Sequence, residues 1–138
     1  MRSARLFLVF LLVLGCSDPF DNPPSSDDVA GVYDLESVNG APLPFTGPVG
    51  DATVTIISST LTLELPANAA PPYPGHVVTQ YAAQAGPSSA VLVWRWDGAL
   101  LLVSFADGES GGGWDDGRFT IQQLPGSPPG GYMYRKRP

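Results

Sequence analysis

The segment Thr60-Leu61-Thr62-Leu63-Glu64-Leu65 has the clearest alternation of apolar and polar residues in the chain. Successive side chains of a β-strand point to opposite faces, so this spacing predicts a strand whose three leucines face a core. The two threonines and the glutamate are then expected to face outward. A half-buried strand of this kind needs neighbouring strands, and the flanking sequence supplies candidates on both sides.

Short runs of β-favouring residues recur along the chain, separated by groups of Gly, Pro, Asn, Asp and Ser. We expect eight strands, over residues 29–37, 52–57, 60–65, 76–85, 89–96, 99–105, 118–122 and 131–136. Ser58-Ser59 is expected to be a turn, and Asp97-Gly98 a type I′ hairpin turn. The segments after Val38 up to Gly50, over 66–75 and over 107–117 are expected to be loops, because Pro and Gly dominate them.

No stretch after Cys16 shows helical periodicity of useful length. Eight short strands are typical of an antiparallel sandwich or barrel, and eight is about the number that closes around side chains or one small ligand. The sequence therefore predicts one all-β domain over residues 29–138, an antiparallel sandwich or barrel. A chain of this length is sufficient for one hydrophobic core and not for two.

The first fifteen residues have the features of an export signal. Arg2 and Arg5 precede the unbroken apolar run Leu6–Leu14, and the small residue Gly15 follows. As a helix, that run would extend only about 14 Å, roughly half of a 30 Å hydrocarbon core. We therefore expect residues 1–15 to be a signal peptide rather than a membrane span.

The last residues of this leader, Val13-Leu14-Gly15-Cys16, resemble the lipobox of bacterial lipoproteins. The resemblance implies that diacylglycerol is attached to the Cys16 thiol, that the leader is cut before Cys16, and that the new amino group receives a further acyl chain such as palmitate. Ser17 after the cysteine resembles outer-membrane sorting in a diderm host. The alternative is an ordinary cleaved signal with a cysteine at this place by chance.

Residues 16–28 are expected to form a flexible tether with the lipidated Cys16 at its start. The segment is rich in Pro, Ser, Asp and Asn and lacks periodicity, so it buries too little to offset the entropy of ordering. Cys16 is the only cysteine, which leaves no intramolecular disulfide. After cleavage, five basic and thirteen acidic residues remain, a net charge of −8. This sign argues against nucleic acid as a partner, because phosphate contacts need clustered Lys and Arg.

Both ends of the predicted domain resemble lipocalin-like domains of bacterial lipoproteins. The opening has the form Gly31-Val32-Tyr33-x-Leu35-x-Ser37-Val38-Asn39-Gly40-x-Pro42-Leu43-Pro44, and the close is Tyr132-Met133-Tyr134-Arg135-Lys136-Arg137. Trp94 with Asp97-Gly98 resembles the middle hairpin of that family. The resemblance implies that the domain is a small antiparallel eight-stranded up-and-down barrel of lipocalin-like form. It also implies a cation–π contact of Arg135 or Arg137 with Tyr33.

Aromatic residues are the candidates for a ligand cavity. Large aromatic side chains fill cores more often than they bind ligands, so both roles stay open here. The expected cavity-lining residues are Tyr33, Tyr81, Trp94, Trp96, Tyr132 and Tyr134, with Trp114 as a further candidate.

Two polar patterns suggest chemistry, but each lacks its usual context. Gly108-Glu109-Ser110-Gly111-Gly112 matches G-x-S-x-G, yet no helix is predicted after it and the only histidine, His76, comes earlier. Four carboxylates follow each other in one predicted loop without EF-hand spacing, and His76 has no second nitrogen or sulfur ligand. We expect no catalytic residue, no metal and no cofactor. The four carboxylates are Asp107, Glu109, Asp115 and Asp116.

Together these patterns predict a membrane-anchored lipoprotein of the cell envelope with a non-catalytic β-barrel domain. Its expected role is structural or one of binding envelope proteins. The first alternative is binding of a small apolar ligand in the barrel, and a remote one is a hydrolase using Ser110. A filled interior with an apolar patch outside would favour the structural or protein-binding role. A connected apolar pocket would favour binding of a small apolar ligand.

Overall fold

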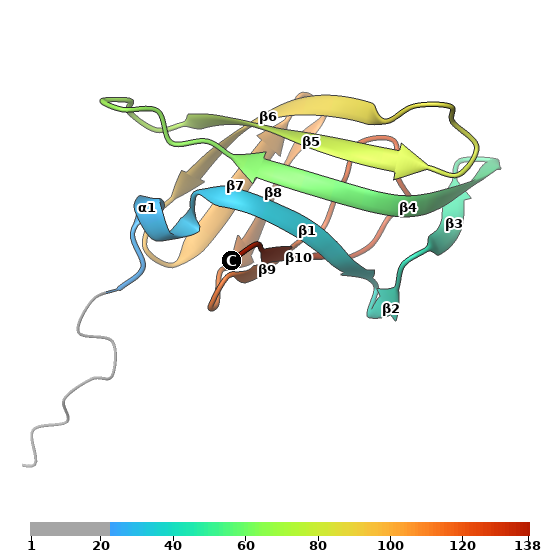
Figure 1. Ribbon diagram of the computed structural model, residues 1–138, viewed down its shortest axis with the longest axis horizontal. Coiled ribbons are helices and arrows are strands. Elements are labelled where there is room, and N and C mark those ends of the chain that lie inside the picture. Colours follow the sequence, from blue (N-terminus) through green and yellow to red (C-terminus); the bar gives the residue numbers. More distant parts are fainter. Residues whose placement is uncertain (1–22) are drawn as a thin grey trace, which may run out of the picture.

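The computed structural model describes residues 23–138 and is almost entirely β-structure (Figure 1). One short helix, α1 (Ser26–Val29), precedes ten strands in this part of the chain. The strands are β1 (Gly31–Val38), β2 (Ala41–Pro42), β3 (Phe45–Val49), β4 (Ala52–Leu63), β5 (Tyr73–Tyr81), β6 (Ser88–Trp96), β7 (Leu100–Phe105), β8 (Gly108–Gly113), β9 (Arg118–Ile121) and β10 (Tyr132–Lys136). The leader, Cys16 and the first part of the predicted tether lie outside the described residues.

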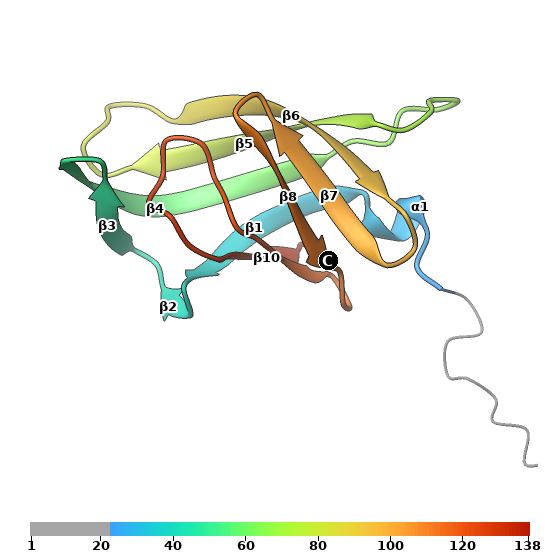
Figure 2. The same cartoon turned by 180° about the vertical axis from the view of Figure 1, so that it is seen from behind.

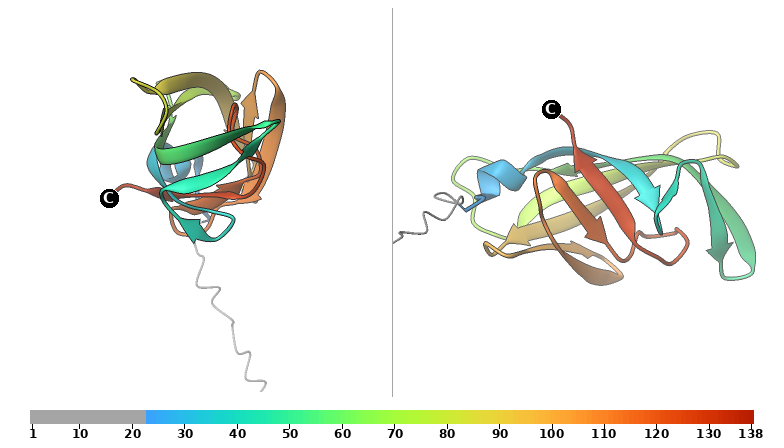
Figure 3. Two further views of the ribbon diagram at one scale, coloured as in Figure 1. Left: turned by 90° about the vertical axis from the view of Figure 1, so that its right-hand side faces the viewer. Right: turned by 90° about the horizontal axis from the view of Figure 1, so that it is seen from below.

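Eight of these strands form a nearly closed antiparallel barrel, in the order β8-β7-β6-β5-β4-β1-β10-β9. Neighbours in the barrel are neighbours along the chain, apart from the excursion through β2 and β3 and the pairing of the first strand, β1, with the last, β10, so the topology is up-and-down. Seen from one end, the strands wrap around a common interior (Figure 3, left). The two outer strands of the sheet, β8 and β9, contact each other and so close the barrel. Figure 2, seen from behind, shows β8 in front. The predicted fold class is confirmed.

The predicted turn at Ser58-Ser59 is wrong, because one long strand, β4, runs through it. Opposite β5, the register shifts between Ile56 and Ser58, which is a β-bulge. The extra residue, Ile57, is 44% exposed, whereas Ser59 is turned into the core. Two runs that look separate by their alternation are therefore one strand whose face changes at the bulge.

The loop predicted over 107–117 is also wrong in its first half, which forms β8 and pairs with β7 from Leu100↔Gly113 to Phe105↔Gly108. Glycine has low strand propensity, so no strand pattern is visible in this segment. The barrel has eight strands as predicted, but only because two errors cancel. The strands expected over 52–57 and 60–65 are one strand, β4, and β8 is a strand that the sequence did not predict. In the first predicted loop, β3 pairs along β4 with Pro48 on its open edge.

The first strand begins later than predicted. Residues 26–29 form α1, and the amide of Ser25 donates to the Asp28 carboxylate at 2.8 Å. Thus residues 23–28, expected to belong to the tether, lie in the described part and include a helical turn. A register shift between Leu35 and Ser37 in β1 then buries Val38 rather than Ser37. No helix within residues 23–138 has the length and apolar character that a membrane span needs.

The Asp97-Gly98 hairpin is confirmed, but its turn type is not. The amide of Asp97 donates to the Leu100 carbonyl, which leaves Gly98 and Ala99 as the loop. Only Gly98 of these two has a positive φ, so the turn is not type I′, which requires both. Asn39 and Gly40, between β1 and β2, do have positive φ values of 52° and 78°.

The core lies inside the barrel and is built by alternation. Leu61 and Leu63 on β4 are 0% and 1% exposed, as their spacing predicts. Leu65 is beyond the end of β4 and only partly buried. Opposing strands contribute the remaining side chains, and α1 adds Val29 at one end of the barrel.

Candidate functional site

The aromatic residues predicted to line a cavity mostly fill the core. Tyr33, Trp94, Tyr132 and Tyr134 are at most 1% exposed, Tyr81 is buried, and Trp96 is half-buried. The Tyr33 ring meets Phe119 edge-on at 4.9 Å between centroids, and Phe119 stacks on Tyr134 at 6.0 Å. The interior of the barrel at this level is therefore occupied by side chains.

The polar ends of these aromatic side chains are paired inside the protein. Tyr134 Oη and Ser59 Oγ are 2.8 Å apart, and Ser59 Oγ and Thr79 Oγ1 are 3.0 Å apart. Tyr132 donates to the Pro128 carbonyl, and Tyr33 to the Val29 carbonyl. Burial raises the pKa of Tyr33 and Tyr132 to about 12 and that of Tyr134 further. These hydroxyls are neutral structural donors at physiological pH.

A mouth pocket of about 310 Å³ opens at one end of the barrel. Its inner wall is formed by Val77, Thr79 and Tyr81, which are buried residues of β5, and its rim includes Pro125 and Gly126. The Tyr81 hydroxyl lies 2.6 Å from Ser127 Oγ and so holds the β9–β10 loop over the opening. Of the six predicted cavity residues, Tyr81 is the one that lines this pocket.

A second depression, which we call the indole cleft, lies at the other end, beside α1. It has a volume of about 570 Å³ and is lined by Pro24, Trp96, Trp114, Asp115 and Asp116 together with Gly98 and Ala99. Trp96 Nε1 donates to the Pro24 carbonyl at 2.7 Å, and Trp114 Nε1 donates to the Tyr33 hydroxyl at 2.9 Å. The two indoles meet at an angle of 67° with centroids 6.3 Å apart.

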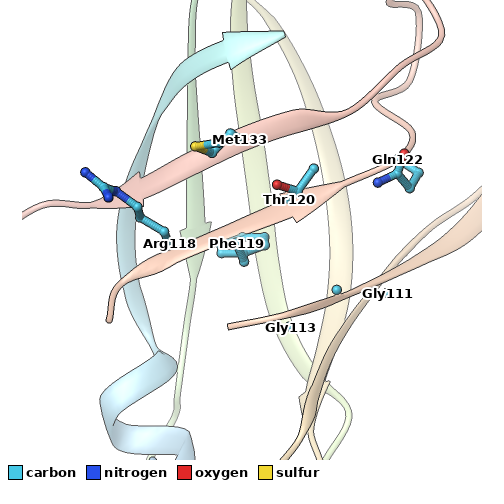
Figure 4. Close-up of a pocket in the computed structure, with 8 residues that line it drawn as sticks. Gly111, Gly113, Arg118, Phe119, Thr120, Gln122 and Met133 are labelled. Carbon is cyan, nitrogen blue, oxygen red and sulfur yellow. The ribbon is translucent and has the colours of Figure 1, made fainter. Parts of the chain in front are cut away.

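The barrel seam, where β8 meets β9, contains a third cleft of about 440 Å³. Figure 4 shows the glycine-rich end of β8 passing beside β9, with Arg118 at the start of β9 and Gln122 just after its end. No continuous ladder joins these strands in the described chain. Instead the Gln122 amide donates to Ser110 Oγ at 3.2 Å, and Asp115 bridges to Arg118 through backbone groups.

An apolar surface lies on the outer face of β5, β6 and β7. Val91 is 79% exposed, Val93 41% and Leu100 45%. The register places Pro74 beside Val93, and Leu102 one strand further along beside Arg95. Outer faces of antiparallel sheets are usually polar, so these residues are unusual for a solvated surface. We call this group the β6 patch: Pro74, Val91, Val93, Leu100 and Leu102.

The predicted cation–π contact with Tyr33 is wrong. Arg137 donates two hydrogen bonds of 2.7 Å to the Asp34 carboxylate, and the Arg135 guanidinium lies 3.2 Å from the Glu36 carboxylate. Both carboxylates are on the outer face of β1, whereas the Tyr33 ring is inside. Arg137 holds the pKa of Asp34 below its ordinary value through its hydrogen bonds.

The polar patterns of the sequence are not brought together. Ser110 is buried on β8, where its hydroxyl accepts from the Gln122 amide, while His76 on β5 lies 3.8 Å from Glu64. Two strands, β6 and β7, separate Ser110 from His76. Of the four clustered carboxylates, Asp115 and Asp116 reach the indole cleft, and Glu109 accepts from Ser104 at 2.7 Å. Within residues 23–138, no three metal-ligating side chains lie together.

Some residues at these sites were not singled out by their sequence pattern. The sequence pattern places Pro24 in the expected tether and Gly111–Gly113 in an expected loop. A signal exists for the glycines in hindsight, since three in a row after an inward-facing serine leave room for close approach of another strand. Pro24 carries no such signal, because its partner, Trp96, is 72 residues away.

Comparison with known proteins yields no match for this chain among family models, curated proteins or solved structures.

Proposed function

We propose that this protein is an exported lipoprotein, anchored through Cys16, whose barrel binds another protein of the cell envelope through the β6 patch. The observation that carries the proposal is the exposure of branched apolar side chains on the outer face of β6, beside a core already filled by aromatic rings. The leader Arg2–Gly15 with its lipobox-like end supports the anchor.

A protein partner fits the patch better than a bilayer does. The chain from Cys16 onward has a net charge of −8, which opposes close contact with anionic lipid. Exposed apolar patches rimmed by polar groups mark protein interfaces, and here Arg95 and Glu109 flank the valines. The acyl chains would hold the domain near the membrane surface, so the patch would meet its partner there.

The anchor is tested with the full-length chain expressed in a bacterial host that carries the lipoprotein pathway. Wild-type protein should sediment with membranes, and mass spectrometry should find its amino terminus at Cys16 with added acyl mass. Cys16→Ser should leave the protein in the soluble fraction. Equal membrane association and an unshifted amino terminus in this variant would overturn the lipoprotein proposal.

The patch is tested by site-specific photo-cross-linking at position 91 in whole envelopes. A discrete adduct should form, and Val93→Lys should abolish it, because a buried charge opposes docking. Thr53→Lys, an exposed substitution on β4, is the matched control and should leave the adduct unchanged. An adduct that survives Val93→Lys, or the lack of any adduct at 91, would refute the role of the patch.

The mouth pocket supports a second candidate, the binding of a small apolar ligand. Its volume of about 310 Å³ is at the lower end of ligand sites, and Val77, Tyr81 and Ala90 give it apolar walls. Native mass spectrometry of the purified full-length protein is the test. A bound compound that is lost from Val77→Asp would favour this role, and its absence in gently extracted protein would speak against it.

A further inference from the structure

We propose that the indole cleft binds an organic ammonium group, as found in choline and in choline-type lipid headgroups. This is a separate site from the β6 patch, and it does not depend on the lipoprotein anchor. The cleft lies beside α1 and the β6–β7 turn, which adjoin each other in Figure 2.

The two indoles are fixed in place before any ligand arrives. The Trp96 N–H is held by the Pro24 carbonyl at 2.7 Å, and the Trp114 N–H by the Tyr33 hydroxyl at 2.9 Å. Both side chains are half-buried and line the cleft. Because their only donors are already used, the rings can offer a ligand π-surface and apolar contact, but no hydrogen bond.

The charge of the cleft selects a cation. Asp115 and Asp116 line it and are exposed, and within residues 23–138 neither carboxylate has a Lys, Arg or His partner at ion-pair distance. A quaternary ammonium is attracted both by carboxylates and by the negative face of an indole ring. A ligand whose only charged group is a carboxylate or a phosphate would be repelled, and an uncharged apolar ligand would gain nothing from the two aspartates.

The shape of the cleft also fits a compact group. Its volume of about 570 Å³ exceeds what a trimethylammonium group needs, so a ligand with a short polar extension is accommodated. Pro24 closes one side of the cleft through its bond to Trp96. Cys16 is eight residues before Pro24, a distance of at most about 29 Å for an extended chain. A lipid headgroup is therefore within reach of the cleft if the anchor is present, and a free cation is the other source.

The experiment uses full-length protein in a maltoside detergent, which has no ammonium group, and follows the three indole N–H signals by NMR. Choline should shift the signals of Trp96 and Trp114 saturably and leave that of Trp94, whose N–H donates to the Glu64 carbonyl, unchanged. The neutral isostere 3,3-dimethylbutan-1-ol should bind at least about tenfold more weakly, because it lacks the charge. Equal binding of the two compounds would overturn the proposal.

The variant Asp115→Asn with Asp116→Asn should weaken choline binding by about fivefold or more. Asn is nearly isosteric and tolerates the positive φ of 47° at position 116, so the fold should persist. Asp51→Asn, exposed and outside the cleft, is the control and should bind choline as wild type does. Unchanged affinity in the double variant would refute the cation site. Glycerophosphocholine separates the sources: binding as tight as that of choline indicates a headgroup, and weaker binding indicates a free cation.

Discussion

Gly112 on β8 lies directly against the backbone carbonyl of Thr120 on β9. A Cβ atom at position 112 would be 2.4 Å from that oxygen, far inside any normal contact, whereas one at Gly113 would meet nothing within 4 Å. The barrel therefore closes at this point by contact of one backbone with another. Glycine is needed at 112 for that approach and not at 113.

Gly112→Ala should lower the free energy of unfolding by about 1–3 kcal/mol, because the strands must separate to admit the methyl group. Gly113→Ala is the matched control and should be neutral or slightly stabilising, since alanine restricts the unfolded chain. Urea unfolding followed by tryptophan fluorescence measures both. Equal stability of the two variants would mean that β8 and β9 do not close the barrel as described.

Tyr134→Phe should cost about 1 kcal/mol of stability, since it removes the buried bond between Tyr134 Oη and Ser59 Oγ while Thr79 still pairs with Ser59. Tyr73→Phe is the control: the Tyr73 hydroxyl makes no hydrogen bond within residues 23–138, and its removal should change little. Thermal unfolding of both variants provides the measurement. A larger loss for Tyr73→Phe would contradict the described network.

Alkaline pH should unfold the barrel through its buried tyrosines. Tyrosine ionises near pH 10 in an unfolded chain, whereas burial raises the pKa of Tyr33 and Tyr132 to about 12 in the folded protein. The folded state thus holds these protons more tightly. The resulting stabilisation is fully present below pH 10 and is lost as the pH rises toward 12.

Absorbance at 295 nm reports tyrosinate, and circular dichroism reports the fold during the same titration. We expect part of the tyrosinate signal to rise together with loss of β-structure above about pH 11. Complete ionisation of all five tyrosines near pH 10 with the fold intact would contradict the burial of Tyr33, Tyr132 and Tyr134.

Trp96→Phe should loosen the segment before β1 with little change in global stability. The variant keeps an aromatic ring but removes the N–H that binds the Pro24 carbonyl at 2.7 Å. If the free energy of opening this segment falls by about 1 kcal/mol, the segment opens about fivefold more often. Hydrogen exchange at the amides of Val29 and Ala30, which bond to Ser25 and Ser26, should accelerate by that factor, while the amides of β4 stay unchanged.

Local alternation accounts for much of what the sequence predicted correctly. Leu61, Leu63, Leu92 and Trp94 face the core because a strand buries every second residue. The errors occur where one extra residue interrupts that period: the bulges near Ile57 and Glu36 change the inward face in mid-strand. Such bulges depend on the register with the partner strand, which is not visible in one segment alone.

For the candidate sites too, the sequence predicted one part and only the structure shows the rest. The aromatic residues were identified from the sequence, but whether each fills the core or borders a cleft was not. Trp94 and Trp96 are two residues apart on one face of β6, yet Trp94 is buried beside Glu64 and Trp96 lies at the end of the barrel beside Pro24. Their different positions along the barrel axis give the two indoles different neighbours, the Glu64 carbonyl after β4 for Trp94 and the Pro24 carbonyl before α1 for Trp96.

By itself, the sequence determined the all-β class, the succession of most of the short strands and the inward leucines, because these depend on side-chain alternation and turn residues close together in the chain. Only the tertiary structure decided that β8 and β9 meet at a glycine seam, that Trp96 joins Pro24, and that valines of β6 stay exposed. Each of these depends on contacts between residues distant in sequence, or on the lack of a covering element, and neither is encoded in local periodicity.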